Sequence, residues 1–216
     1  MNLKATVDYS LYLVTDRELA GNRSVIQVVE TAIRGGVNIV QYREKSASTR
    51  QMIAEAQSLL DICHRYAVPL IINDRVDVAL AIDADGVHVG QEDMPAELVR
   101  KILGSDKIIG VSVESTAQVE TAVAAGADYV ASSPVYTTAT KPDAVHALGI
   151  SGVKTLAQAS PLPLIAIGGL NAANCAEVVR AGADSIAVVS AIMAADNPEE
   201  AARLLSRLIR ENRTKK

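Results

Sequence analysis

The chain of 216 residues lacks several features that would assign it to a specialised class of protein. It contains no tryptophan, no phenylalanine and only six tyrosines, so its core must be built from aliphatic side chains. Its only two cysteines, Cys63 and Cys175, fall in segments with helical patterns, which predicts packing thiols in a reducing compartment and not a disulfide framework. The longest weakly polar run, Ser185 to Ala195, is far shorter than the roughly 20 residues that span a bilayer.

The sequence also lacks a basic excess, and its first residues do not have the pattern expected of a leader segment. Its formal net charge is -4, so no positive surface field is available to attract nucleic acid. The first ten residues carry Lys4 and Asp8 without an apolar stretch, unlike a secretory signal. We therefore expect a cytoplasmic globular protein with neither a nucleic-acid nor a membrane partner. The assembly state is left open, a homo-oligomer included.

The length and the 49% share of apolar residues fit one domain over residues 1–216, with residues 210–216 expected to form a frayed basic tail. Along this domain, short β-branched runs alternate with amphipathic helical patterns. The runs are almost continuously apolar, which is typical of a parallel sheet buried on both faces. Strands are predicted at Leu11–Val14, Asn38–Tyr42, Leu70–Ile72, Gly86–Val89, Ile108–Val111, Tyr129–Ala131, Leu164–Ile167 and Ser185–Val189. Helices are predicted at stretches such as Ser24–Arg34, Ser48–Tyr66, Ala96–Leu103, Thr116–Ala124, Ala172–Arg180 and Pro198–Arg210.

A short glycine-containing segment recurs where a helix passes into the next strand, at Gly35–Val37, Asp85–Val87, Ala125–Asp128 and Ala181–Asp184. We expect the glycine to supply the left-handed turn that ends each helix. Eight strands in regular alternation with helices predict an α/β protein that forms a single-domain (β/α)8 TIM barrel. The alternative is an open doubly wound sheet, which usually has fewer strands and a glycine-rich loop after the first, where this chain has Thr15–Arg17.

The predicted carboxyl ends of the strands, where barrel enzymes carry their catalytic groups, are rich in polar residues. Strand alternation places Gln41, Arg43 and Lys45 on one side of the second strand. Asp74 and Asp93 follow two neighbouring strands and could share one Mg²⁺ ion, with water and substrate oxygens completing its coordination.

The cations and the acid pair together predict two anion sites at this end of the barrel. Arg43, Lys45 and Lys141 would surround a polyanion, and their combination with a carboxylate-bound Mg²⁺ indicates a diphosphate. Backbone amides at Gly168–Gly169, before a helix expected near Asn171, and those around Ser190 would form the phosphate site common in barrels.

Each of these residues also has a simpler interpretation. Asp74 or Asp93 alone could cap a helix, and Arg43 and Lys45 could be rim charges paired with Glu44, while Lys45 could instead form a Schiff base. His88 is interpreted as a hydrogen-bonded barrel residue. His64 and His146 have no partner that the sequence identifies.

Taken together, the residues described above resemble those of the thiamine-phosphate synthase family, and the resemblance extends from about Tyr12 to Leu208. The motifs that carry the resemblance are Gln41–Lys45, Ile72–Arg75, Gly86–Asp93, Gly110–Ser112, Thr138–Lys141, Ile167–Gly169 and Val189–Ile192. The resemblance implies a transferase that joins a hydroxymethylpyrimidine diphosphate to a thiazole phosphate, plain or carboxylated, and releases diphosphate.

The resemblance also implies a role for each matching residue. One Mg²⁺ ion per active site would be held by Asp74 and Asp93, and Gln41 would orient the pyrimidine. The diphosphate would be bound by Arg43, Lys45, Asn73, Ser112 and Lys141, of which Arg43, Lys45, Ser112 and Lys141 are the expected catalytic residues. The thiazole phosphate would be held by Thr138, Thr140, Gly169 and the backbone of Val189 and Ser190.

Two positions depart from the family pattern: Ser133 stands where a glycine is common, and Glu114 stands near the place of a histidine. A related thiazole tautomerase depends on a histidine soon after the fifth strand and lacks much of the metal and diphosphate set. Because Glu114 replaces that histidine while Asp74 and Asp93 are present, the sequence favours the synthase. It also favours the synthase over a precursor-binding sensor or a generic sugar-phosphate barrel.

Overall fold

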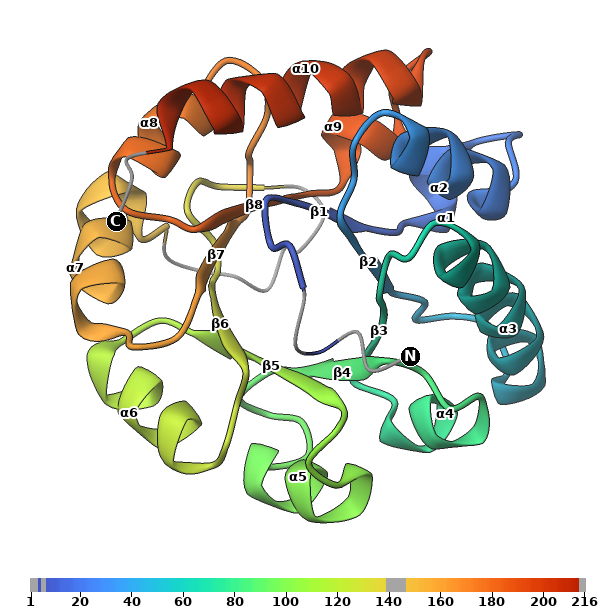
Figure 1. Ribbon diagram of the computed structural model, residues 1–216, viewed down its shortest axis with the longest axis horizontal. Helices are drawn as coiled ribbons and strands as arrows, with labels where there is room; N and C mark the ends of the chain where they lie inside the picture. The colour runs from blue at the N-terminus through green and yellow to red at the C-terminus, as the bar shows by residue number, and fades with distance from the viewer. Residues whose placement is uncertain (1–3, 5–6, 139–146, 214–216) are drawn as a thin grey trace.

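The computed structural model describes residue 4, residues 7–138 and residues 147–213. Eight parallel strands close into a barrel in the order of the chain, and helices surround this ring (Figure 1). The strands are β1 (Leu11–Val14), β2 (Ile39–Tyr42), β3 (Leu70–Asn73), β4 (Gly86–Val89), β5 (Ile108–Val113), β6 (Tyr129–Ser132), β7 (Leu164–Ile167) and β8 (Ser185–Val188). The predicted (β/α)8 barrel is therefore confirmed, and the open sheet is excluded.

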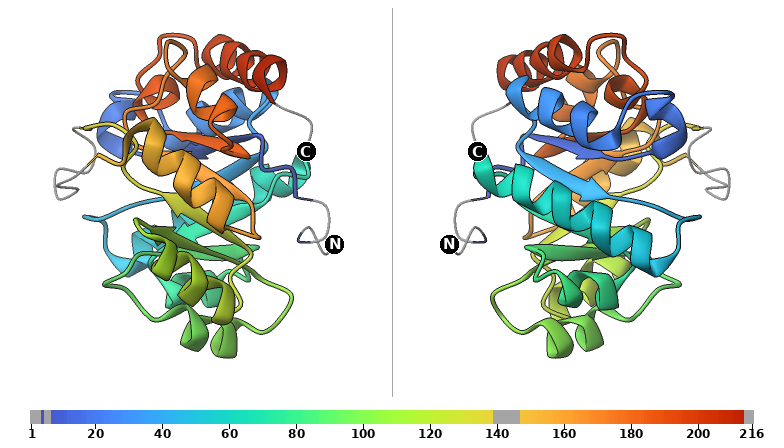
Figure 2. Two further views of the ribbon diagram at one scale, coloured as in Figure 1. Left: turned by 90° about the vertical axis from the view of Figure 1, so that its left-hand side faces the viewer. Right: turned by 90° about the vertical axis from the view of Figure 1, so that its right-hand side faces the viewer.

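The helices lie outside the barrel, as two side views show (Figure 2). They are α1 (Arg17–Ala20), α2 (Val25–Arg34), α3 (Thr49–Arg65), α4 (Val76–Ala81), α5 (Ala96–Leu103), α6 (Thr116–Ala124), α7 (Gly149–Ala159), α8 (Cys175–Arg180), α9 (Ser190–Met193) and α10 (Pro198–Asn212). Local sequence explains where several begin. Ser48 and Gln51 form a capping box at α3, and Asn197 caps α10 ahead of Pro198. None of the helices in the described ranges has the length and apolar character that a membrane crossing requires.

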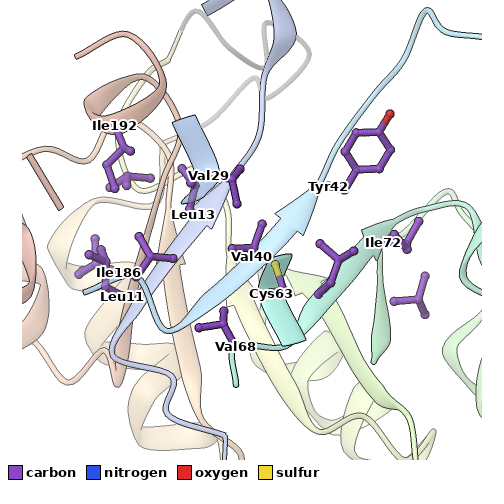
Figure 3. Packing of buried hydrophobic residues seen from close by; sticks show 14 of the residues in the cluster. Leu11, Leu13, Val29, Val40, Tyr42, Cys63, Val68, Ile72, Ile186 and Ile192 are labelled. Atoms are coloured by element: carbon purple, nitrogen blue, oxygen red, sulfur yellow. The ribbon is translucent and has the colours of Figure 1, made fainter. Parts of the chain in front are cut away.

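Two apolar layers hold the barrel together. The outer layer packs the outward side chains of the strands against the helices, for example Leu13 and Val40 against Val29 of α2 and Cys63 of α3 (Figure 3). Cys63 and Cys175 are both buried free thiols in this layer, which confirms their predicted packing role.

The inner layer fills the barrel with side chains from alternate strand positions, and Val7 and Tyr9 of the segment before β1 pack against it. Its members are Tyr12, Val14, Ile39, Ile71, Ile108, Tyr129, Ala131, Ile165 and Ala187.

The glycine junctions follow the prediction at three of four places. Gly36, Gly126 and Gly182 have φ values of 108°, 79° and 113°, in the left-handed region. The prediction was wrong at Gly86, because the left-handed residue of that junction is Asp83, with φ 55°. Gly86 instead begins β4, where a Cβ atom would lie 2.2 Å from the carbonyl oxygen of Ile108.

The end of the chain also differs from the prediction. Helix α10 continues to Asn212, and the Arg213 guanidinium donates to Ser10 Oγ at 3.0 Å and to the Asp184 carbonyl oxygen at 2.5 Å. Residues 210–213 are thus tied to the amino end of the barrel and are not frayed, whereas residues 214–216 lie outside the described part.

The inner layer generates a stability prediction at Gly110 of β5. A Cβ atom there would lie 2.0 Å from Cζ of Tyr129, a ring that is fully buried. We expect Gly110→Ala to lower the free energy of unfolding by about 1–3 kcal/mol or more, because overpacking a rigid core forces side chains off their preferred positions. Urea denaturation monitored by circular dichroism measures this change.

The matched control places the same substitution in a Tyr129→Leu background, where the colliding atoms are absent. The cost of Gly110→Ala should then fall to less than about half, because the two sites are coupled through one contact. Equal costs in both backgrounds would contradict the packing.

Candidate active site

A cavity of about 540 Å³ lies at the carboxyl ends of the strands and is lined by residues from all eight of them. It brings together every predicted site residue that the structure describes. These residues are Gln41, Arg43, Lys45, Asn73, Asp74, Asp93, Ser112, Thr138, Gly169, Val189 and Ser190. Thr140 and Lys141, together with His146, lie outside the described residues. The cavity is therefore the candidate active site.

The segment after β2 presents Arg43 and Lys45 to this cavity, whereas Glu44 of the same segment does not line it. Lys45 Nζ donates to Asp74 Oδ2 at 2.6 Å, across to the end of β3. Glu44 pairs with neither Arg43 nor Lys45, contrary to the interpretation of these cations as rim charges paired with Glu44. Instead Glu44 Oε2 accepts a hydrogen bond from Arg17 Nε at 2.8 Å, which links the segment to α1.

A small hydrogen-bond network around Glu44 fixes the conformation of this segment. The backbone N–H groups of Ser46 and Ala47 donate to Glu44 Oε1 at 2.7 and 3.2 Å. Burial raises the pKa of the Glu44 carboxyl, but the hydrogen bonds from Arg17, Ser46 and Ala47 outweigh burial and lower the pKa from its usual 4.5 to about 2. Glu44 therefore stays ionised and serves as an anchor outside the cavity.

Two carboxyl groups meet at the ends of β3 and β4. Asp93 Oδ2 accepts a hydrogen bond from the Gly90 N–H at 2.8 Å. Burial raises the pKa of Asp93, and contact with the Asp74 carboxyl raises it further, although the Gly90 N–H and Lys45 act in the opposite direction. Asp74 itself has a φ of 59°, in the left-handed region that most residues other than glycine avoid and that aspartate tolerates better than most.

The acid pair is the metal-ligand candidate of the site. Carboxylate oxygens are the donors that Mg²⁺ prefers, and a divalent cation would relieve the repulsion that raises the pKa of Asp93. Within the described ranges, no cluster of three or more histidine, cysteine, aspartate or glutamate side chains is arranged to hold a metal ion. The two aspartates thus fit a cation that takes its other ligands from water or substrate.

A polar layer beneath these charges contains His88, which the sequence analysis interpreted correctly, and Tyr12 and Tyr129, which it missed. His88 Nδ1 lies 3.0 Å from the Tyr129 hydroxyl and Nε2 lies 2.9 Å from Ser112 Oγ, so His88 is confirmed as a hydrogen-bonded barrel residue. Tyr12 and Tyr129 line the cavity from within apolar strands. Only their inward positions in the period-two alternation of β1 and β6 could have revealed them.

The predicted phosphate-binding glycines form a turn and not the start of a helix. Gly168 and Gly169 have φ values of 108° and 66°, and Asn174 Nδ2 donates to the Gly169 carbonyl oxygen at 2.9 Å. The helix expected near Asn171 begins only at Cys175, because Asn171 N donates to Asn174 Oδ1 in a turn that precedes α8. After β8, by contrast, α9 begins at Ser190 itself.

Of the remaining histidines, His64 has a partner that the sequence did not identify. Its Nε2 atom lies 3.0 Å from Asp85 Oδ2, away from the cavity. The same carboxyl accepts from the Leu70 N–H at 2.8 Å, so this pair helps to hold the start of β3.

Comparison with known proteins gives a consistent picture. A family model described as thiamine monophosphate synthase matches residues 11–192. The chain is 54% identical over 209 residues to the thiamine-phosphate synthase of Chloroflexus aurantiacus, covering 97% of this chain and 96% of that protein. It is 46% identical to the thiamine-phosphate synthase of Clostridium novyi, covering 94% and 99%.

Solved structures show the same relationship. Thiamine phosphate pyrophosphorylase from Pyrococcus furiosus superposes with a TM-score of 0.87 at 38% identity, covering 95% of this chain and 97% of that one. The 3-hexulose-6-phosphate synthase of Salmonella typhimurium superposes with a TM-score of 0.69 at 19% identity, which indicates a shared fold alone.

The Glu44 anchor generates a prediction about acid stability. Its pKa is depressed in the folded state, so its contribution to stability is present above pH 4.5 and is lost as the pH falls from 4.5 towards 2. In Glu44→Gln this contribution is absent at every pH, so acidification from pH 6 to pH 3 should lower the melting temperature less than in the wild type.

Differential scanning calorimetry across this pH range makes the comparison, with Glu18→Gln on the exposed side of α1 as the charge-matched control. The control should follow the wild-type pH dependence. An identical acid response in Glu44→Gln and the wild type would show that Glu44 does not anchor the segment.

Proposed function

The chain belongs to the thiamine monophosphate synthase family, and from this membership we propose that it joins 4-amino-2-methyl-5-hydroxymethylpyrimidine diphosphate to 4-methyl-5-(2-phosphoethyl)thiazole or its carboxylate. The products would be thiamine monophosphate and diphosphate. The observation that carries this proposal is the meeting of an acid pair and cations in one cavity at the barrel mouth. We place the reaction in the cytoplasm, a reducing compartment that suits the buried free thiols.

The pyrimidine diphosphate would lie across the half of the cavity built by β2 to β5. Arg43, Lys45, Asn73 and Ser112 offer cations and neutral donors to the diphosphate oxygens, and the proposal adds Lys141 by its match to the family motif. Gln41 is 6% exposed and lies deeper, where its amide can recognise the edge of an aminopyrimidine. In this arrangement the charged diphosphate and the aromatic pyrimidine of one substrate would bind to different parts of the cavity.

Asp74 and Asp93 would hold one Mg²⁺ ion. When bound, this ion would supply positive charge to the diphosphate oxygens as the leaving group departs. Lys45 already contacts Asp74 at 2.6 Å, so a cationic side chain, the acid pair and the diphosphate would share one set of contacts. Such preorganised charge is commonly the largest contribution to catalysis.

The thiazole phosphate would bind at the opposite side, at Thr138, Thr140, Gly169 and the backbone of Val189 and Ser190. In the reaction, the bond between the pyrimidine methylene carbon and the diphosphate oxygen breaks, and its electron pair leaves with the diphosphate. The aminopyrimidine ring delocalises the positive charge on that carbon. The lone pair of the thiazole nitrogen then forms the new C–N bond. The nitrogen carries no proton, so the step needs no general base.

The related isomerase function finds less support in the cavity. Glu114 lines the cavity at the end of β5, where the isomerase would need a histidine. The acid pair would have no part in a tautomerisation without diphosphate. The named relatives are synthases at 44–54% identity, which likewise favours the transferase.

Product formation tests the proposal directly. Purified protein given both substrates should release thiamine monophosphate and diphosphate in equal amounts, and only in the presence of Mg²⁺. Asp93→Ala should lower kcat/KM by about a hundredfold or more, because removing preorganised charge from a transition state costs that much in comparable sites. Coupled detection of diphosphate with chromatography of the thiamine product measures both.

Asp61→Ala, on α3 and outside the cavity, serves as the matched control and should retain wild-type activity. A folded wild-type protein that binds thiazole phosphate but forms no thiamine monophosphate would refute the synthase and leave the isomerase or a binding protein.

A further inference from the structure

Five polar side chains form an unbroken hydrogen-bonded chain across the floor of the cavity. Gln41 Nε2 donates to the Tyr12 hydroxyl at 2.9 Å, and this hydroxyl lies 2.8 Å from that of Tyr129. The Tyr129 hydroxyl lies 3.0 Å from His88 Nδ1, and His88 Nε2 lies 2.9 Å from Ser112 Oγ. The chain thus joins the side chain proposed to recognise the pyrimidine to one proposed to bind the diphosphate.

The hydrogen bonds in this chain must all run in one direction. Each tyrosine hydroxyl has a single proton, and a neutral imidazole donates from one nitrogen and accepts at the other. Because Gln41 donates to Tyr12, the Tyr12 proton points to Tyr129, and the Tyr129 proton points to His88 Nδ1. His88 then donates from Nε2 to Ser112. If Tyr129 instead donated to Tyr12, the buried Tyr12 proton would have no acceptor among the contacts of the described residues, at a cost in free energy.

In this direction the two ends of the chain have linked and opposite characters. Ser112 Oγ accepts from His88, which leaves its O–H to donate into the cavity. Gln41 uses its Nε2 on Tyr12, which leaves Oε1 to accept from a ligand. Reversing the direction would require Gln41 to present Oε1 to Tyr12 and its NH₂ group to the ligand, and Ser112 would then present only lone pairs.

We propose that Tyr12, Tyr129 and His88 are positioning residues that couple the two halves of the site. An anionic acceptor at Ser112 fixes the donor direction through the chain, so that Gln41 presents an acceptor to a ligand amino group. This inference rests on the proposed function, because an aminopyrimidine diphosphate carries an amino donor at one end and anionic oxygens at the other.

The surroundings of the chain preserve it. Tyr12 and Tyr129 are 1% and 0% exposed, and burial raises the pKa of both hydroxyls well above the usual value, so they keep their protons. Gly110 leaves the space that the Tyr129 ring occupies, since even a Cβ atom there would collide with the ring. The Tyr9 ring packs 5.6 Å from the Tyr129 ring and supports it from the amino end of the barrel.

Binding of two substrate fragments tests the coupling without turnover. Isothermal titration calorimetry measures the affinity of the phosphate-free hydroxymethyl aminopyrimidine with and without saturating inorganic diphosphate and Mg²⁺. In the wild type, diphosphate should tighten pyrimidine binding by about fivefold to tenfold, the lower range of typical coupling between sites. In Tyr12→Phe and Tyr129→Phe, which lack only a hydroxyl of the chain, the enhancement should fall below about twofold.

Tyr9→Phe is the matched control. It also removes one tyrosine hydroxyl, from a ring that packs against Tyr129, yet leaves the five-residue hydrogen-bonded chain complete. It should retain the wild-type coupling. A thermal melt of each variant identifies any that fail to fold, and full coupling in either folded chain variant would overturn the proposal.

The tautomer of His88 provides a second readout that a purely structural role would not change. With diphosphate bound, ¹⁵N NMR of labelled histidine should place the proton on His88 Nε2, and Tyr129→Phe should shift part of the population to Nδ1. A proton on Nδ1 in the wild-type complex would overturn the proposed direction. Product formation with undiminished coupling in both chain variants would refute this inference alone, whereas no binding of either fragment to the wild type would refute the proposed function as well.

Discussion

The structure of the candidate site depends on the electrostatic constraint imposed by two carboxyl groups in contact. The parallel pairing of β3 with β4 brings their carboxyl ends together, and Asp74 and Asp93 then face each other where burial and mutual repulsion raise the pKa of Asp93. Lys45 offsets part of this charge from the neighbouring strand. A site with such a charge distribution suits a ligand that brings both a divalent cation and a polyanion, since either alone would leave one sign uncompensated.

The remaining features keep these charges in place. Arg17 pairs with Glu44 outside the cavity, and Lys45 of the same segment contacts Asp74 inside it. Beneath the charges, the barrel contains a buried hydrogen-bonded layer in place of a purely apolar one. The rings of Tyr12 and Tyr129 belong to the inner apolar cluster, and this cluster and the helices outside supply the apolar burial that stabilises the barrel. The charged groups at the mouth are therefore supported by a buried layer in which hydrogen bonds and apolar packing occur together.

The sequence predicted the barrel and a set of residues that the structure brings together in the candidate site, for identifiable reasons. Continuous apolar runs located all eight strands, because a parallel sheet buried on both faces leaves few polar positions. The residues at the strand ends were found because barrel topology collects them at one mouth. The left-handed residue was misplaced at Gly86, where close packing against Ile108 and not backbone conformation requires glycine. Tyr12 and Tyr129 were not predicted, because the two hydroxyls that hydrogen bond to each other belong to residues 117 positions apart in sequence, and no local sequence pattern indicates such a contact.

If the site binds metal and diphosphate jointly, its affinity for inorganic diphosphate with and without Mg²⁺ shows this most directly. Calorimetry on the wild type should show that Mg²⁺ tightens diphosphate binding by about tenfold or more, and that Asp74→Asn abolishes this enhancement. Diphosphate binding that is equally tight without Mg²⁺, or an enhancement that persists in Asp74→Asn, would contradict the account.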